Sequence, residues 1–205
     1  IGHSFSILTR DKMKTINPGK SFNDTALIFG PGTGLGAAQV IGNDIILPTE
    51  IGNSSFRIPS LLSELGILDD TSFNVVEDLI SGRGLSKIYS YFANANKTSE
   101  QIVATYNQDQ LSQKSINIFL IAFSQILSEL ALIYMPGKGI YVVGSLMRNL
   151  DKFLDAKIFM NNFLINRKSM HADILAQIPI ALIENEMTCL HGSLNYINKL
   201  TQNIN

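Results

Sequence analysis

The glycine-rich segment at residues 30–36, GPGTGLG, is the first part of the chain with an evident chemical use. An apolar, strand-like run over residues 25–29 precedes it. Glycine lets a backbone approach a phosphate closely, so backbone N–H groups and the hydroxyl of Thr33 could donate to phosphate oxygens. These residues alone leave two interpretations open, a phosphate-binding loop and an ordinary glycine-rich turn.

Two other phosphate-binding motifs can be compared with this segment. A P-loop has the pattern GxxxxGK[ST], which fails here because no lysine follows Gly36. A dinucleotide-binding fingerprint can be fitted through Gly32, Gly34 and Ala37, but it needs a helix directly after the loop. Residues 37–47 instead predict two strands joined by a tight turn. We therefore expect the segment to be a hairpin loop.

Two glutamates have positions suited to binding a sugar. Glu50 follows a short predicted strand, and Glu77 precedes a break at Ser81-Gly82, so both could lie at element ends near a cleft. Carboxylates accept hydrogen bonds from neighbouring hydroxyls, each worth about 1.5–3 kcal/mol where water is excluded. Taken alone, a glutamate such as Glu77 is more commonly a solvated charge on a helix face.

The elements that must position these residues alternate between strands and helices. Strands are expected at residues 25–29, 37–41, 45–47, 139–144 and 178–183. Helices are expected from residue 59 up to Gly66, over 73–80 with Ser72 as cap, over 85–92, after a capping box at Thr98–Gln101, over 116–135, in two segments of 150–165, and over 188–200. This order predicts a layered α/β fold.

Composition narrows the class of protein further. The 205 residues are 45% hydrophobic and 16% charged with a net charge of −1, which suffices for one sizeable folded unit and argues against a nucleic-acid partner. The single cysteine, Cys189, excludes an internal disulfide and favours a cytoplasmic location. The three histidines lie far apart, so we expect no metal site within the chain.

Residues 116–135 are apolar and long enough to cross a bilayer. Polar residues interrupt this run, however, and Glu129 would be costly at membrane depth. We therefore expect a buried helix of an α/β protein and no membrane partner.

Four spaced segments together resemble the motifs of bacterial glucokinases. The pattern GxGTGLGAA at 30–38 is similar to that family's second phosphate motif, and LPTEIGN at 47–53 to its LPGEGGH segment. EDLISGRGL at 77–85, with Tyr89 beyond it, matches E-x-x-[LI]-SGxGL-x-x-x-Y, and IYVVGS at 140–145 resembles the adenosine motif. Since that family belongs to the hexokinase and actin-like ATPase group, the resemblance implies a ribonuclease H-like α/β lobe with a central mixed sheet flanked by helices.

The resemblance also implies ligands for each motif. ATP, which carries Mg²⁺, would bind Gly32, Thr33, Gly34, Gly144 and Ser145. Glucose or a related hexose would bind Glu50, Asn53 and Glu77. Similar glucokinases suggest that the long apolar helix could also serve a homodimer.

The chain departs from the family's pattern at four positions. Asn53 replaces the family's histidine, Thr49 and Ile51 replace two glycines, and Ser145 replaces the second glycine of the adenosine motif. These changes bear on substrate identity and rate. They favour an alternative function, a degenerate sugar-binding or regulatory protein on the same scaffold.

The family's catalytic aspartate, in an Asn-Asp pair, and its first phosphate motif, D-x-G-G-T, do not occur here in a matching context. The Asn-Asp pairs at 23–24 and 43–44 precede a strand and lie in a turn. We therefore expect no catalytic residue in this chain, and a large C-terminal glucokinase lobe that is inactive alone. Within the chain we expect a linker over residues 1–20, the lobe over 21–187 and a C-terminal helix over 188–205.

Overall fold

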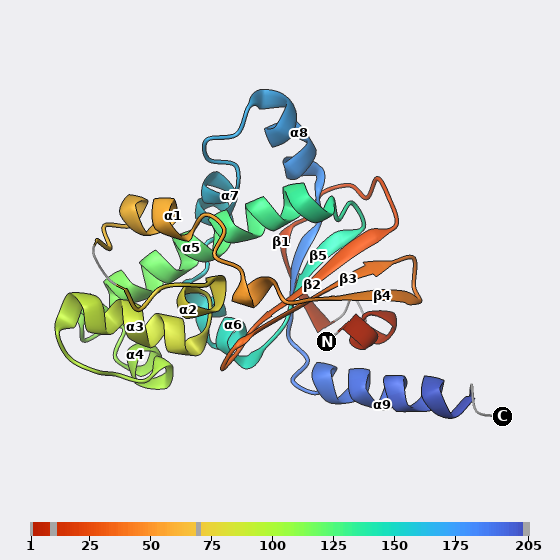
Figure 1. Cartoon of the computed structure of the whole chain (residues 1–205), viewed down its shortest axis with the longest axis horizontal. Helices are drawn as coiled ribbons and strands as arrows, with labels where there is room; N and C mark the ends of the chain where they lie inside the picture. The colour runs from red at the N-terminus through yellow and green to blue at the C-terminus, as the bar shows by residue number, and fades with distance from the viewer. Residues whose placement is uncertain (1, 9–11, 69–70, 203–205) are drawn as a thin grey trace.

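The computed structural model describes residues 2–8, 12–68 and 71–202, which build a six-stranded sheet packed with helices (Figure 1). The strands are β1 (Met13–Asn17), β2 (Thr25–Pro31), β3 (Leu35–Ile41), β4 (Ile45–Thr49), β5 (Gly139–Val142) and β6 (Ile180–Ile183). The α-helices are α1 (Ile58–Glu64), α2 (Val76–Leu79), α3 (Gly82–Ala93), α4 (Ser99–Ala104), α5 (Gln110–Tyr134), α6 (Ser145–Leu150), α7 (Ala156–Phe163), α8 (Ser169–Gln177) and α9 (Thr188–Gln202). Short 3-10 helices are η1 (Gly2–Ile7), η3 (Ile51–Asn53) and η4 (Asp151–Phe153).

The sheet is mixed, and its strand order is β1-β6-β5-β2-β3-β4. Strands β2, β3 and β4 are joined as successive antiparallel hairpins, whereas β5 runs parallel to β2 and β6 runs parallel to β5. The predicted mixed α/β architecture is thereby confirmed. Because strand β3 directly follows the glycine segment, the dinucleotide-binding interpretation is excluded.

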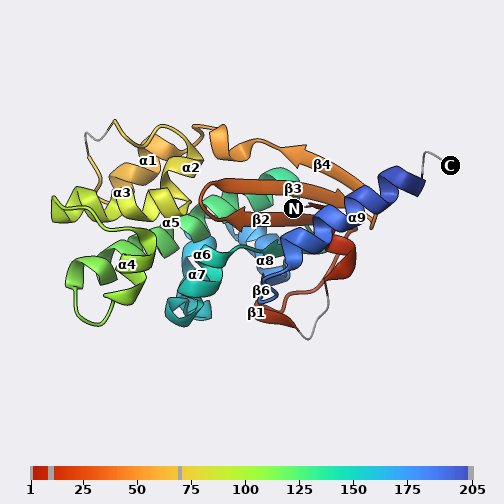
Figure 2. The same cartoon turned by 90° about the horizontal axis from the view of Figure 1, so that it is seen from below.

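Helix α5 packs across one face of the sheet and forms the main core with it. The Phe123 ring of α5 lies 5.9 Å from the ring of Phe29 on β2 and 6.0 Å from that of Phe159 on α7, measured between centroids. Figures 1 and 2 show η1 and α9 on the opposite face of the sheet. There α9 contacts η1 through the ring of Tyr196, whose centroid lies 4.5 Å from that of His3.

Helix α5 is long and apolar enough to cross a membrane by length and composition, yet 67% of its most apolar window is buried within the fold. Its one glutamate is held by two cations. Glu129 pairs with Arg167 at 2.9 Å and with Arg57 at 3.4 Å. The predicted buried helix is therefore confirmed, and the charge inside it is compensated by the surrounding segments.

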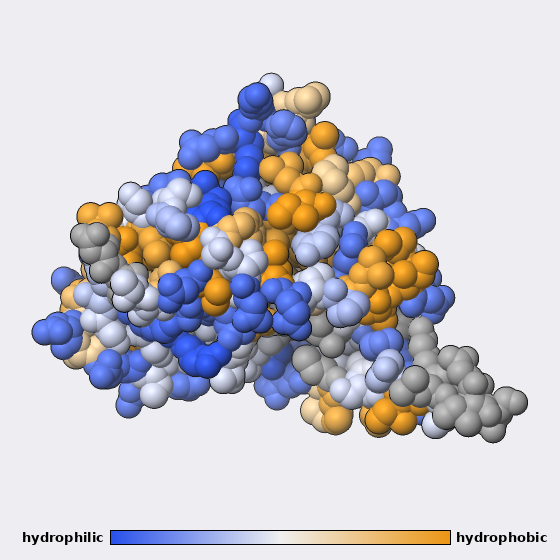
Figure 3. Space-filling model, in the orientation of Figure 1, coloured by the Kyte–Doolittle hydropathy of each residue, from blue (hydrophilic) through white to orange (hydrophobic). Residues whose placement is uncertain are grey.

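Figure 3 shows where polar and apolar side chains gather on the face seen in Figure 1. Hydrophilic side chains cover the region of η3 and α2. Apolar side chains gather over the far ends of β3 and β4, where Ile41, Ile45 and Leu47 are exposed. The polar surface coincides with the two segments that carry the predicted sugar-binding residues.

Three expectations about the elements are wrong. Residues 13–17 are not a peripheral linker, because β1 pairs antiparallel with β6 as an edge strand. The sequence did not predict this strand because only Ile16 of its residues is buried, so the segment lacks the alternation of apolar and polar residues typical of a strand. The helix expected over 73–80 is restricted to Val76–Leu79, since the Asp78 carboxylate accepts from the N–H groups of Asn74 and Val75 and holds that turn outside the helix. Helices α6 and α8 were not predicted as separate elements.

The Phe123 ring should be a main contributor to stability. Phe123→Ala removes a fully buried ring that contacts both β2 and α7, so we expect the free energy of unfolding to fall by about 3–5 kcal/mol. Urea unfolding followed by circular dichroism measures this loss. Ile133→Ala, at a position that is 59% exposed on the same helix, should cost less than about 1 kcal/mol; equal losses would contradict the packing described here.

Candidate functional site

The glycine segment is a narrow hairpin. Strand β2 continues to Pro31 and β3 begins at Leu35, which leaves Gly32–Gly34 as the loop. Gly30 and Gly36, expected outside the strands, pair with each other across the ladder. The N–H of Gly32 donates to the carbonyl of Gly34 at 2.7 Å, and Thr33 is exposed at the tip.

The carboxylate of Glu77 braces this hairpin. Its Oε2 accepts from the backbone N–H of Leu35 at 2.8 Å. A Cβ at Gly34 would lie 2.7 Å from the same oxygen, so a side chain there would displace the carboxylate. On the other side of the loop, the N–H of Gly82 donates to the carbonyl of Gly32 at 2.8 Å. The hairpin is therefore held between α2 and the start of α3.

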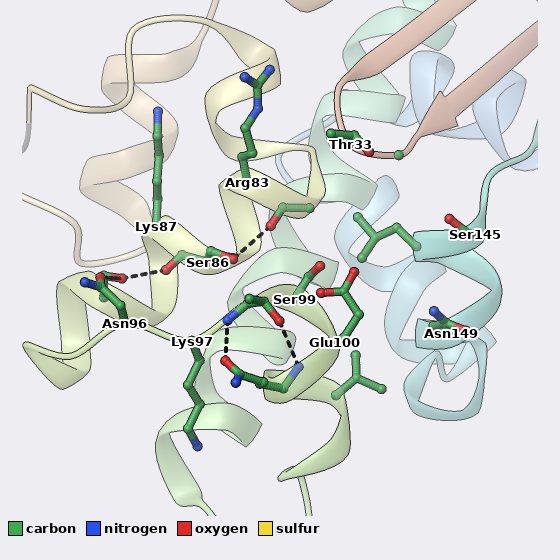
Figure 4. Close-up of a pocket in the computed structure, with 17 residues that line it drawn as sticks. Thr33, Arg83, Ser86, Lys87, Asn96, Lys97, Ser99, Glu100, Ser145 and Asn149 are labelled. Carbon is green, nitrogen blue, oxygen red and sulfur yellow. Dashed lines mark hydrogen bonds between the residues drawn. The ribbon is translucent and has the colours of Figure 1, made fainter.

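A pocket of about 670 Å³ opens beside the hairpin (Figure 4). Its walls come from the hairpin tip, the first half of α3, residues 96–103 and the start of α6. Three of the predicted nucleotide-binding residues line it, Gly32, Thr33 and Ser145. Gly34 and Gly144 lie next to these residues in the chain but do not line the pocket.

Gly144 has a structural reason to be glycine. Its φ of +110° is a backbone conformation that other residues rarely adopt, and a Cβ there would lie 2.5 Å from the carbonyl oxygen of Pro31. This close approach seats the β5–α6 junction against the base of the hairpin. Ser145, which replaces the second glycine of the family motif, is exposed at the start of α6 and faces the pocket.

The predicted sugar-binding residues lie on the other side of the hairpin. Glu50 immediately precedes η3 and Asn53 is its last residue, and the side-chain amide of Asn53 donates to Glu50 Oε2 at 3.2 Å. The N–H of Val76 donates to the carbonyl of Ser54 at 2.8 Å, which brings η3 next to the helix that carries Glu77. None of the three predicted sugar-binding residues lines the pocket.

The two residues that replace glycines in this loop are accommodated in different ways. Ile51 is partly buried and packs against the main core. Gly52, which the chain retains, faces the carbonyl of Leu35, where a Cβ would lie at 3.1 Å. Thr49 is the last residue of β4. The substituted loop therefore still approaches the hairpin closely.

The sequence alone did not indicate the charged residues of the pocket. Arg83, Lys87 and Lys97 line it together with Glu100. Arg83 occupies the variable position of the SGxGL motif, so no motif signalled it. The sequence feature closest to them was the predicted capping box of Thr98 and Gln101, which the structure confirms. It begins α4 in the part of the pocket wall that carries Lys97 and Glu100.

Lys97 is held by a cluster that includes the last residue of the motif, Tyr89. The carboxylate of Asp109 accepts from Lys97 at 2.7 Å, from Ser112 at 2.8 Å and from Tyr89 at 3.0 Å. Hydrogen bonds from Lys97 and then Ser112 hold the pKa of Asp109 well below its usual range. In turn the hydrogen bond to Asp109 raises the pKa of Lys97. Lys97 is thereby held in an ion pair with Asp109.

In the part of the chain that the structure describes, no three His, Cys, Asp or Glu side chains converge as a metal-binding group. Glu100 is the one carboxylate among the pocket-lining residues described. Mg²⁺ bound to a nucleotide is held largely by phosphates and water, and needs few protein ligands. The pocket therefore fits a cation that arrives with a nucleotide better than one resident in the protein.

Known proteins resemble this chain in sequence and in fold. The chain aligns over 197 residues with a glucokinase-like protein of Xylella fastidiosa strain Temecula1, at 28% identity, covering 89% of this chain and 58% of that protein. A glucokinase from an Antarctic psychrotroph has a similar structure, with a TM-score of 0.81 and 21% identity over 97% of this chain and 66% of that one. A glucokinase from Balamuthia mandrillaris, solved with glucose, gives a TM-score of 0.74 and 18% identity over 94% of this chain and 62% of that one.

The fold is that of the actin-like ATPase group to which these sugar kinases belong. A family model for glucokinase matches residues 1–200. The chain therefore belongs to the glucokinase family, and it spans 58% of the length of the Xylella relative.

The bond between Glu77 and Leu35 can be tested directly. Glu77→Ala removes the acceptor of the Leu35 amide, and a charge-assisted bond of about 1.5–3 kcal/mol corresponds to roughly 10- to 150-fold faster exchange of that amide. Hydrogen exchange followed by NMR measures the rate. Glu100→Ala removes a carboxylate from the pocket wall and should leave the Leu35 amide protected. Equal exchange in wild type and Glu77→Ala would disprove the bracing role.

The Asp109 cluster predicts a dependence of stability on pH. Because the folded-state pKa lies below the ordinary value of 3.8, the contribution of Asp109 is complete above that value and is lost as the pH falls toward the folded pKa. We expect the urea midpoint to fall more steeply between about pH 5 and pH 2 in wild type than in Asp109→Asn. Asp173→Asn, at an exposed position on α8, should keep the wild-type slope; a wild-type slope in Asp109→Asn would count against the cluster.

Proposed function

We propose that this chain is the nucleotide- and sugar-binding lobe of an ATP-dependent glucokinase that phosphorylates the 6-hydroxyl of glucose, acting in glycolysis in the cytoplasm. The observation that supports the proposal is that the pocket and the predicted sugar-binding residues share one hairpin. The same seven-residue segment lines the pocket with Gly32 and Thr33 and is braced from the opposite side by Glu77. A phosphoryl donor and a hydroxyl acceptor bound there would meet across the hairpin.

In this proposal the pocket takes ATP. Backbone N–H groups of the hairpin and the Thr33 hydroxyl would contact the phosphates, and Gly144 and Ser145 would contact the adenosine. Arg83, whose side chain is 66% exposed, supplies a cation at the pocket that suits a polyphosphate. Mg²⁺, when bound with the nucleotide, would neutralise charge on the transferred phosphoryl group.

The sugar would bind on the opposite side of the hairpin. Glu50, Asn53 and Glu77 supply two carboxylates and one amide, which together can accept from and donate to several neighbouring hydroxyls. The Balamuthia glucokinase, a structural neighbour, was solved with glucose, and this supports glucose or a related hexose as the ligand here.

The general base would come from outside this chain. Proton removal from the attacking hydroxyl is worth about 10²- to 10⁴-fold in rate, and no Asn-Asp pair lies at the candidate site. Asn23-Asp24 precedes β2, and Asn43-Asp44 forms the β3–β4 turn. We therefore propose that the complete protein is active and that these 205 residues bind ligands without turnover. We also propose that the active protein is a homodimer.

A second candidate is a sugar-binding regulatory protein without kinase activity. The observation that favours it is the position of Asn53, which stands in place of the family's histidine and whose amide is turned to Glu50. An amide differs from imidazole in reach and cannot carry a positive charge. A sugar could thus be bound in an orientation that does not favour transfer.

An assay of turnover distinguishes the glucokinase from the sugar-binding regulatory protein. In a glucose-dependent ADP-release assay on the complete protein, we expect activity that falls about 10- to 100-fold in kcat/KM in Glu77→Gln, because one charge-assisted hydrogen bond to the sugar is weakened. Glu186→Gln, an exposed residue before α9, provides the same change of charge and should keep full activity. Activity unaffected by Glu77→Gln would refute the sugar-binding role, and glucose binding without turnover would establish the regulatory protein.

A further inference from the structure

Arg83 lies between the two candidate sites. It is the second residue of α3, lines the pocket with Gly32 and Thr33, and forms an ion pair with Glu77. Its side chain is 66% exposed, so little packing holds it in this conformation. In Figure 4 its guanidinium points away from Ser99 and Glu100 on the opposite wall.

The other two cations of the pocket wall are committed to partners outside the sugar-binding group. Lys87 donates to the carbonyl of Ser72 at 2.7 Å and pairs with Asp78. Lys97 pairs with Asp109 at 2.7 Å. Among the described residues that line the pocket, Arg83 is therefore the cation whose partner is a predicted sugar-binding carboxylate.

Both oxygens of Glu77 accept hydrogen bonds from within the chain. Oε2 accepts from the Leu35 amide, and Oε1 accepts from Arg83. A sugar hydroxyl that approaches Glu77 must share or displace one of these donors. The Leu35 amide is part of the backbone of β3, whereas the exposed arginine side chain can rotate away.

A polyphosphate at the hairpin offers Arg83 an alternative partner. Guanidinium groups bind phosphate oxygens in the same bidentate geometry that they use with carboxylates. A nucleotide phosphate beside Gly32 and Thr33 would lie at the pocket rim that carries Arg83. The negative charge of the phosphates would favour the exchange over retention of the pair with Glu77.

We infer that Arg83 exchanges partners between Glu77 and the nucleotide phosphates, so that nucleotide binding frees Glu77 Oε1 for the sugar and strengthens sugar binding. The inference rests on the proposed function and adds a coupling between its two sites. Coupling of this kind is reciprocal, so the sugar strengthens nucleotide binding by the same factor. Direct couplings between ligands commonly amount to about 5- to 150-fold in affinity.

The coupling can be measured by calorimetry on this chain. The dissociation constant for glucose is determined with and without a saturating, non-hydrolysable ATP analogue and Mg²⁺. In wild type we expect the analogue to tighten glucose binding about tenfold. In Arg83→Gln we expect less than about twofold tightening, while glucose alone binds at least as well as to wild type because its competitor at Glu77 is gone.

Two controls separate this role from a structural one. Arg148→Gln on α6 makes the same chemical change outside the pocket lining, and it should keep the wild-type coupling. In Arg83→Gln the Leu35 amide should stay protected from exchange, because its acceptor Glu77 is still present. Loss of that protection would mean that Arg83 maintains the hairpin instead, and would overturn the inference.

The remaining outcomes are distinct. If wild type and Arg83→Gln bind both ligands with the same coupling, the exchange is refuted and the proposed function stands. If wild type binds neither glucose nor the analogue, the proposed function fails for this chain, and the inference fails with it.

Discussion

The hydrogen bond from the Leu35 amide to Glu77 is the contact on which the arrangement of the site depends. It joins the first residue of β3 to α2 over a separation of 42 residues, and the carboxylate that accepts it is one-quarter exposed. This bond joins α2 directly to the hairpin, beside the indirect connection through η3, where Val76 bonds Ser54 and Gly52 lies against Leu35. The bond between Gly82 and Gly32 then fixes the opposite side of the loop, so that the loop lies between two anchored helix ends.

The geometry of the site is set largely by backbone contacts at glycines. Gly34 lies against the Glu77 carboxylate, and Gly144 lies against the carbonyl of Pro31, in both cases closer than a Cβ would permit. Gly52 makes a similar but looser approach to Leu35. Ile51, which replaces one of the family's glycines, packs against the core and leaves the approach of Gly52 to Leu35 intact. This explains how the chain can depart from the family's pattern in the sugar loop and still bring Glu50 near α2.

Much of the fold could be predicted because its signals are local. The hairpin follows from glycines between two apolar runs, the wall of the pocket from the Thr98–Gln101 capping box, and the buried α5 from its apolar length. The features that could not be predicted lack such a local signal. Strand β1 has almost no buried face, and the start of α2 is decided by a carboxylate that bonds the preceding backbone. The pairing of Arg83 with Glu77 depends on where α3 begins relative to α2, and no residue pattern expresses that relation.

The edge strand β1 has a consequence for how the chain is assembled during synthesis. Met13 pairs with Ile183, so β1 finds its partner only after about 170 further residues have been added. At ribosomal rates of about 5–20 residues per second, this wait lasts roughly 10–30 seconds. The β2–β3–β4 meander needs no such wait, because its pairings close within 25 residues of chain, from Thr25 to Thr49. Translation therefore completes the β2–β3–β4 hairpins well before β1 can pair with β6.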